Sequence, residues 1–245
     1  MTILQTKKCL RRWANATHHP LGGMRMTPFW GSKAAALYAQ YQHSLALPGI
    51  SATGMRDPST DRRLKFWLNP GRVYGSPSQQ DYNLYAGGLG VESVEMRRVW
   101  KWTAKRLRSC GVTTRVAADW SKLEGSAGYM NAVRDSNAWH PDVHIPTHSN
   151  AGAPGSVGTV TFYRWGSASG KRLAACLQRH VAPVSPGADH GIRAQTGWAE
   201  LYVNATVGYI ELAYHSNPAE AKSIVQHPAV YGYALADGIL EYLTG

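Results

Sequence analysis

Hydrophobic and polar positions follow different patterns in the first quarter of the chain and in the rest. Residues 1–63 show no sustained hydrophobic period, and only the stretch near Ala34 to Tyr41 has a helix-like pattern. Turn-forming residues such as Pro20 and Gly22 interrupt the remainder. We therefore expect residues 1–63 to be an N-terminal extension that is loosely ordered.

From residue 64 onward, the hydrophobic positions follow the periods of regular elements. Leu64, Phe66 and Leu68 alternate with polar or outward-facing positions, which predicts a strand. Helix-like and strand-like segments then alternate, and Gly111 supplies the stop signal of the first helix. The expected helices cover residues 91–110, 128–139, 171–180 and 228–243, and the expected strands cover residues 112–117, 142–147, 158–163 and 207–213. This alternation predicts one α/β domain over residues 64–245, with a largely parallel sheet flanked by helices on both faces.

Positive charge is concentrated in the N-terminal extension. The chain has 245 residues and a formal net charge of +11, and residues 1–63 hold nine Lys and Arg side chains against two Asp. Such an excess favours a polyanionic partner, which could be nucleic acid, an anionic membrane or a phosphate-bearing polymer. The chain has neither a zinc-finger spacing nor a recognisable RNA-binding motif, so we do not expect it to bind nucleic acid.

The cysteines and the apolar segments exclude two other classes of protein. Cys9, Cys110 and Cys176 are widely separated, which predicts ordinary thiols rather than a disulfide framework or a thiolate metal site. No segment approaches the about 20 apolar residues of a membrane span, and the N-terminus lacks the apolar stretch of a signal peptide. We therefore expect a chain without a membrane span that is synthesised in the cytoplasm.

Three ionisable side chains stand near the expected carboxyl ends of strands, where sheets of this kind bind ligands. His148 follows an apolar strand, Glu211 interrupts another, and Glu92 opens the helix after a glycine-rich loop. Each also has a structural interpretation: a satisfied histidine, a buried ion pair, and a helix-dipole interaction worth about 0.3–1 kcal/mol. Because an unpaired buried carboxylate costs several kcal/mol, Glu211 requires an ion pair or a functional role.

Together these segments resemble the zinc-dependent N-acetylmuramoyl-L-alanine amidases of the type-3 amidase domain, over about residues 64–243. The sequences HIPTHSNA at 144–151 and IELAYHSN at 210–217 are similar to the family's histidine-ligand and catalytic-glutamate strands. The sequence VESVEM at 91–96 is similar to its glutamate-ligand helix. The resemblance implies that Glu92 and His148 are zinc ligands and that Glu211 is catalytic.

The chain departs from the family at the first metal ligand. Most members have a histidine there, whereas residues 76–83 read SPSQQDYN and resemble a branch with the pattern SPSxQxxN. Gln80 is the best positional candidate, although its amide oxygen is a weaker zinc donor than an imidazole nitrogen. His215 is an alternative, and a water or another group is a third. The residues that remain as candidates to bind metal or substrate are His215, Asn83 and Asn150.

The resemblance implies a peptidoglycan hydrolase that cleaves the amide bond between N-acetylmuramic acid and L-alanine, with zinc-activated water and Glu211 as general base. The alternative is a peptidoglycan-binding protein that has the same fold without the activity. The expected partners are peptidoglycan and anionic wall polymers, and the expected state is a monomer.

Lytic chemistry without a signal peptide is typical of a phage endolysin or of an enzyme released on lysis. Residues 1–63 have two alternatives to a loose extension, a small wall-binding element or a start codon assigned too far upstream.

Overall fold

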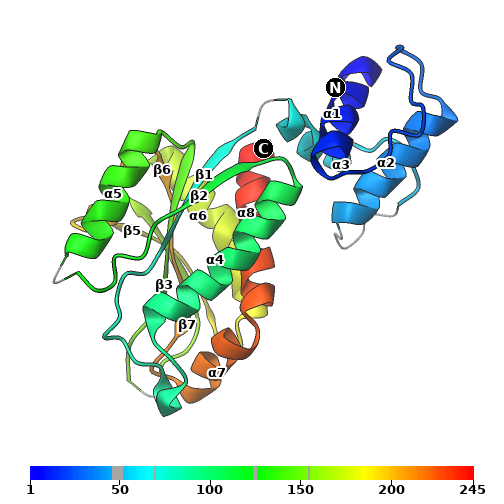
Figure 1. Ribbon diagram of the computed structural model, residues 1–245. Helices are drawn as coiled ribbons and strands as arrows, with labels where there is room; N and C mark the ends of the chain where they lie inside the picture. Colours follow the sequence, from blue (N-terminus) through cyan, green and yellow to red (C-terminus); the bar gives the residue numbers. More distant parts are fainter. Residues whose placement is uncertain (46–51, 69, 124–125, 154) are drawn as a thin grey trace. The chain divides into compact units, whose positions relative to one another are not determined.

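The computed structural model describes residues 1–245 apart from 46–51, 69, 124–125 and 154. The chain divides into two compact units (Figure 1). Unit 1 consists of residues 1–71 with the short pieces 107–113 and 244. Unit 2 consists of residues 72–106, 114–243 and 245. No helix in the described ranges is both long and apolar enough to cross a membrane.

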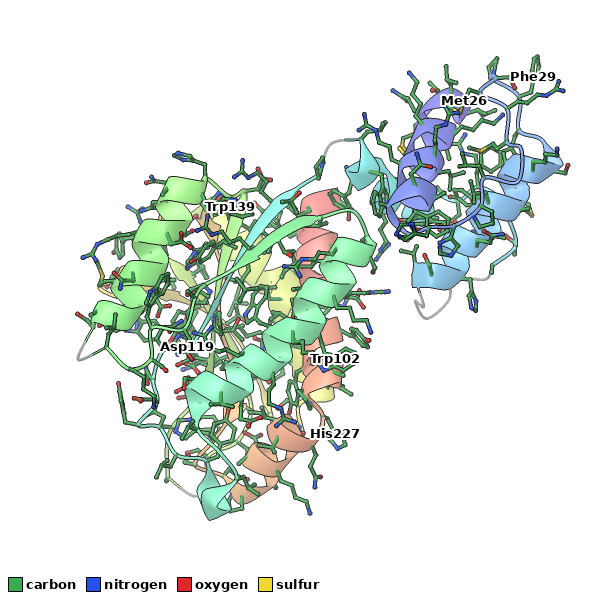
Figure 2. All side chains as sticks on the ribbon, in the orientation of Figure 1. Met26, Phe29, Trp102, Asp119, Trp139 and His227 are labelled. Atoms are coloured by element: carbon green, nitrogen blue, oxygen red, sulfur yellow. The ribbon has the colours of Figure 1, made fainter. Side chains whose placement is uncertain are left out.

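Unit 1 is built from short helices around a buried aromatic core. Its elements are α1 (Ile3–Ala16), α2 (Ser32–Leu45), α3 (Pro58–Leu64) and the 3-10 turn η1 (Lys65–Trp67). Thr2 and Gln5 form a capping box at the start of α1, which satisfies amide groups that a helix end leaves free. The Trp13 ring packs edge-on against the Tyr41 ring with 5.3 Å between the ring centroids, and both side chains are buried. Phe29, which is 78% exposed, projects from the segment between α1 and α2 (Figure 2).

The structure therefore departs from the expected loosely ordered extension in residues 1–63. In α1, the buried positions Cys9, Leu10 and Trp13 recur at helical spacing, but basic residues precede and separate them and obscure the period. One of these basic residues, Lys7, is itself 3% exposed. Its ammonium donates to the backbone carbonyls of Arg25 and Phe29, so it ties the following loop to the helix.

Unit 2 contains one mixed sheet whose centre is parallel. The strands are β1 (Arg72–Pro77), β2 (Thr113–Val116), β3 (Val143–Asn150), β4 (Thr159–Arg164), β5 (Asp189–Gln195), β6 (Thr206–Val207) and β7 (Tyr209–Tyr214). Their order is β2-β1-β3-β7-β4-β5, and β6 pairs with β3. The β1–β3 and β3–β7 pairs are parallel, whereas β4 is antiparallel to β7. The carboxyl ends of β1, β3 and β7 therefore meet at one edge.

Helices cover both faces of this sheet. The helices of unit 2 are α4 (Glu92–Ser109), α5 (Ala127–Trp139), α6 (Ala168–Val181), α7 (Pro218–Gln226) and α8 (Pro228–Thr244). Figure 1 shows α5 on one side of the sheet and α4 with α8 on the other. The alternation of β3 side chains agrees: the Trp100 indole of α4 donates to Thr147, whereas the His144 ring bonds to Ser136 of α5. Trp102 of α4 (Figure 2) packs edge-on against the Tyr233 ring of α8.

The predicted α/β class, with a largely parallel sheet and helices on both faces, is confirmed. The strand predicted at residues 64–68 is wrong, because α3 and η1 occupy that segment. Strands β1 and β5 were missed, since both lie in segments rich in glycine, proline and serine. In β1, Gly75 is needed because a Cβ there would lie 2.4 Å from the Trp100 ring. The glycine that weakens the strand pattern thus permits the close packing of α4 on the sheet.

Candidate active site

The candidate residues from three distant segments meet at the carboxyl ends of the central strands. His148 lies near the end of β3 and is paired in register with Glu211 on the adjacent parallel strand β7. Glu92 is the first residue of α4. All three side chains are buried. The structure therefore brings Glu92, His148 and Glu211 together, although they are far apart in the sequence.

Glu92 and His148 are in direct contact. Oε1 of Glu92 lies 3.0 Å from Nδ1 of His148 and also accepts the Ser149 amide at 3.0 Å. Burial alone would raise the pKa of Glu92, but the hydrogen bond and the charge of His148, together with the Asn83 amide, lower it below its usual value. Burial would lower the pKa of His148, but Glu200 and Glu92 raise it well above its usual value. Without a metal, the pair is a buried ion pair.

Asn83 links Glu92 to the loop that follows β1. Its Nδ2 donates to Oε2 of Glu92 at 2.6 Å and also donates to Oε1 of Gln80. The backbone strengthens this link, because the Glu92 amide donates to the Asn83 carbonyl and the Ser93 amide to the Gln80 carbonyl. The Asn83 side chain thus bridges the Gln80 carboxamide and the Glu92 carboxylate.

Glu211 carries a buried carboxylate oxygen without a hydrogen-bond partner. Its Oε2 is solvent-inaccessible and unbonded. Burial is the largest cause that raises its pKa, and the nearby charges of Glu92 and Glu200 add to it against the opposing effect of His148, so the pKa reaches about 8. A carboxyl group tuned in this way can hold or release a proton near neutral pH.

Two residues that sequence reasoning missed complete the surroundings of His148. The Tyr209 ring stacks on the imidazole at 4.6 Å between centroids and 12° between planes. Oε2 of Glu200, in the 3-10 turn η4 (Ala199–Leu201), lies 3.3 Å from Nε2 of His148. The angles of this contact fall short of a hydrogen bond. The one sequence signal for Glu200 is its place as an acidic residue beside apolar Leu201 and Trp198.

The remaining candidates lie at the border of the cluster. His215 is buried, its Nδ1 lies 2.9 Å from the Ser149 carbonyl oxygen, and its ring stacks on Tyr85. It is therefore joined to the cluster through Ser149. Asn150 is partly exposed, and its side-chain oxygen accepts the backbone amide of Ala151. The side-chain contact is thus local, whereas the backbone carbonyl of Asn150 accepts the His215 amide at 2.8 Å.

The donor set fits a metal ion in part. Among the residues that the structure describes, no three His, Cys, Asp or Glu side chains surround a common point where an ion could bind. Nevertheless, a carboxylate oxygen of Glu92 lies 3.0 Å from an imidazole nitrogen of His148, and the buried Glu211 oxygen lacks a partner. The Gln80 amide oxygen is linked to Glu92 through the Asn83 amide, which donates to both. These are donors of the kinds that zinc accepts, with one neutral amide in place of a third ionisable ligand.

Comparison with known families decides the relationship. Residues 70–241 match the family model described as Amidase_3, N-acetylmuramoyl-L-alanine amidase. The chain belongs to this amidase family. No curated protein sequence matches the chain.

Solved amidase structures share the fold of this family member. The catalytic domain of the amidase CwlV from Bacillus (Paenibacillus) polymyxa matches with a TM-score of 0.62 at 18% identity, over 71% of this chain and 98% of that one. The amidase Ami1 from Mycobacterium smegmatis matches with a TM-score of 0.63 at 15% identity, over 71% and 96%. The catalytic domain of the CD27L endolysin, which targets Clostridia difficile, matches with a TM-score of 0.62 at 15% identity, over 70% and 97%. At these identities, the likeness establishes the fold alone.

Proposed function

We propose that this amidase hydrolyses the amide bond between N-acetylmuramic acid and L-alanine in peptidoglycan. The observation that carries the proposal is the meeting of Glu92, His148 and Glu211 at the carboxyl ends of β1, β3 and β7. Family membership supports the choice of substrate, since the matched family is named for this bond.

We propose that Glu92 and His148 hold a zinc ion and that the Gln80 amide oxygen is the third protein ligand. The contact from Asn83 to both Gln80 and Glu92 supports this assignment. His215 is the weaker candidate, because Ser149 already engages its Nδ1. Bound zinc supplies a water of lowered pKa and polarises the scissile carbonyl.

Glu211 is the proposed general base. Its buried position beside His148 lets it take the proton of the attacking water and then deliver that proton to the departing L-alanine nitrogen. One carboxyl group can serve both steps, because it is deprotonated before attack and regenerated after release. The products are a free lactyl carboxylate on the sugar and a free amino group on L-alanine.

A wall-binding protein without activity is the second interpretation, and family membership does not favour it. Only an amidase would release reaction products from peptidoglycan. Purified peptidoglycan incubated with the protein and zinc should release new L-alanine amino groups if the chain is an amidase. Binding to the wall without new amino groups, with zinc present in the protein, would establish the second interpretation.

Anionic wall polymers are the proposed second partner, through unit 1. Lys8 and Arg11 are exposed on one face of α1. The two acidic side chains of the unit are engaged internally, because Asp57 caps α3 and Asp61 accepts from Tyr38 and Arg56. The positive charge of α1 is therefore not neutralised by them. We propose that the protein acts on the cell wall, as an endolysin or after release on lysis, and that it is a monomer.

A further inference from the structure

Glu200 is a buried carboxylate to which neither the sequence pattern nor the proposed mechanism gives a role. It is 7% exposed and lies in η4, next to Leu201 in the hydrophobic cluster that also contains Val207 and Tyr209. A carboxylate in such surroundings must be compensated by partners. Its Oε1 accepts from the Ser76 hydroxyl of β1 at 3.3 Å, and its Oε2 lies 3.3 Å from Nε2 of His148.

The two carboxylates contact opposite nitrogens of the same imidazole ring. Glu92 lies at Nδ1 and Glu200 at Nε2, while the Tyr209 ring covers one face. A neutral imidazole can offer a lone pair to a metal at one nitrogen only, and the other nitrogen then carries the proton. The acceptor at that second nitrogen selects which nitrogen is free. Nδ1 is the nitrogen that lies beside Glu92, which is the proposed carboxylate ligand of the same metal ion.

We propose that Glu200 is a positioning residue: its carboxylate, 3.3 Å from Nε2 of His148, favours the proton on that nitrogen, so that Nδ1 is left to bind the metal together with Glu92. This inference rests on the zinc site given under the proposed function. Glu200 touches neither the substrate nor the attacking water in this account. The Ser76 hydroxyl fixes its other oxygen, so the carboxylate is held between β1 and β3.

A packing role for Glu200 makes a different prediction from a positioning role. If the side chain only fills space beside Leu201 and Tyr209, then Glu200→Met, which has a similar volume, preserves the site. If the carboxylate orients His148, methionine removes the acceptor and glutamine retains a neutral one. The positioning role therefore predicts that methionine causes a larger loss than glutamine, with neither change affecting the fold.

The first experiment measures zinc affinity by competition with a coloured chelator on the full chain. Glu200→Gln and Glu200→Met are compared with the wild type and with Glu220→Gln as a matched control. Glu220 is also a buried carboxylate, but it accepts the backbone amides of Gly158 and Tyr214. We expect zinc affinity to fall about 10- to 100-fold in Glu200→Met, by less in Glu200→Gln, and to stay unchanged in the control. Unchanged affinity in a folded Glu200→Met protein would overturn the inference.

The second experiment does not depend on zinc, so it separates failure of this inference from failure of the proposed function. Nitrogen-15 NMR of metal-free protein should show a His148 Nε2–H proton that exchanges slowly and resonates at low field. Glu200→Gln should shift this signal, and Glu220→Gln should leave it in place. If the wild type binds no zinc, the metal proposal fails, but the NMR signal of the His148 Nε2–H proton still tests the contact between Glu200 and His148. An Nε2 signal identical in Glu200→Gln and the wild type would contradict the inference by itself.

Discussion

Glu92 and Glu211 are both buried carboxyl groups, but their surroundings move their pKa values in opposite directions. Hydrogen bonds from His148, Asn83 and the Ser149 amide overcome the effect of burial on Glu92 and lower its pKa. Glu211 has one oxygen without a partner, and burial raises its pKa to about 8. Two like groups with separated pKa values can take different roles, one as an anionic ligand and the other as a proton carrier.

Replacement of Glu211 tests the proton-carrier role. Glu211→Gln should lower the rate of peptidoglycan hydrolysis by about 10²–10⁴-fold, because the amide cannot take a proton from water. Zinc content, measured by elemental analysis of the purified protein, should remain at the wild-type level. Glu241→Gln, on the surface of α8, is the control and should retain full activity. Wild-type turnover in Glu211→Gln would exclude Glu211 as the base.

The pH dependence of stability tests the raised pKa of Glu211 in metal-free protein. A pKa of about 8 in the folded chain, against 4.5 as the ordinary value, means that the folded state binds the proton more tightly. This contribution to stability is complete below pH 4.5 and is lost as the pH rises toward 8. Urea unfolding at several pH values should show that Glu211→Gln has a smaller loss of stability across this window than the wild type. An equal loss in both proteins would contradict the raised pKa.

Sequence reasoning found the residues whose position in a pattern is unusual. A carboxylate within an apolar strand and a histidine at a strand end are visible before folding, so the sequence singles out Glu211 and His148 as candidates, and the structure places them side by side. Glu200 was not, because it lies in a short turn and becomes a partner of His148 only when η4 packs beside β3. Its proposed role depends on a tertiary contact, which no local pattern encodes.

At the scale of elements, the packing of α4 on the sheet positions Glu92 relative to β3. Glu92 opens α4, and the same helix is fixed to β3 by the hydrogen bond from Trp100 to Thr147 at 2.9 Å. The Trp100 ring also occupies the space over Gly75 of β1. The position of Glu92 relative to His148 is therefore set by packing about two helical turns away from it.

Substitution of Gly75 tests this packing. Gly75→Ala should lower the free energy of unfolding by about 1–3 kcal/mol, because the added Cβ would lie 2.4 Å from the Trp100 ring and the helix or strand must shift. Zinc affinity should weaken in parallel. Chemical denaturation gives the first quantity and chelator competition the second. Gly155→Ala, which meets no atom within 4 Å, is the control, and equal stability of the two variants would contradict the account.

The sequence predicted elements well where hydrophobic period and length agreed. The helix predicted at 91–110 corresponds to α4 (Glu92–Ser109), and the strand predicted at 142–147 corresponds to β3 (Val143–Asn150). Strand β1 was missed because its Gly75 and Pro77 are poor strand formers. Gly75 is explained by a tertiary neighbour, because it makes room for the Trp100 ring, and that neighbour is not known until the fold is known.

At the scale of the whole molecule, the chain combines an amidase unit with a helical unit that carries excess positive charge. Composition revealed the charge but not the helices, because the basic residues of α1 interrupt its hydrophobic period. A polyanionic partner therefore stays a prediction from charge, and the sequence does not select its chemical class. The choice of wall polymers follows from the proposed function of unit 2.

Neutralisation of α1 tests the role of unit 1. The double substitution Lys8→Gln and Arg11→Gln should slow lysis of walls that carry phosphate polymers several-fold at low salt, and the difference should shrink as salt screens the attraction. Walls stripped of these polymers should be lysed equally by both proteins. Activity on a small soluble muropeptide provides the control for the active site. A salt-independent difference would count against the electrostatic role.

The most direct test of the central claim is to count L-alanine amino groups released from purified peptidoglycan. The wild type with zinc should release them, a chelator should abolish the release, and added zinc should restore it. Glu211→Gln should release almost none although it contains zinc. Release that continues unchanged in the presence of chelator, or new reducing sugar ends without new L-alanine amino groups, would contradict the account.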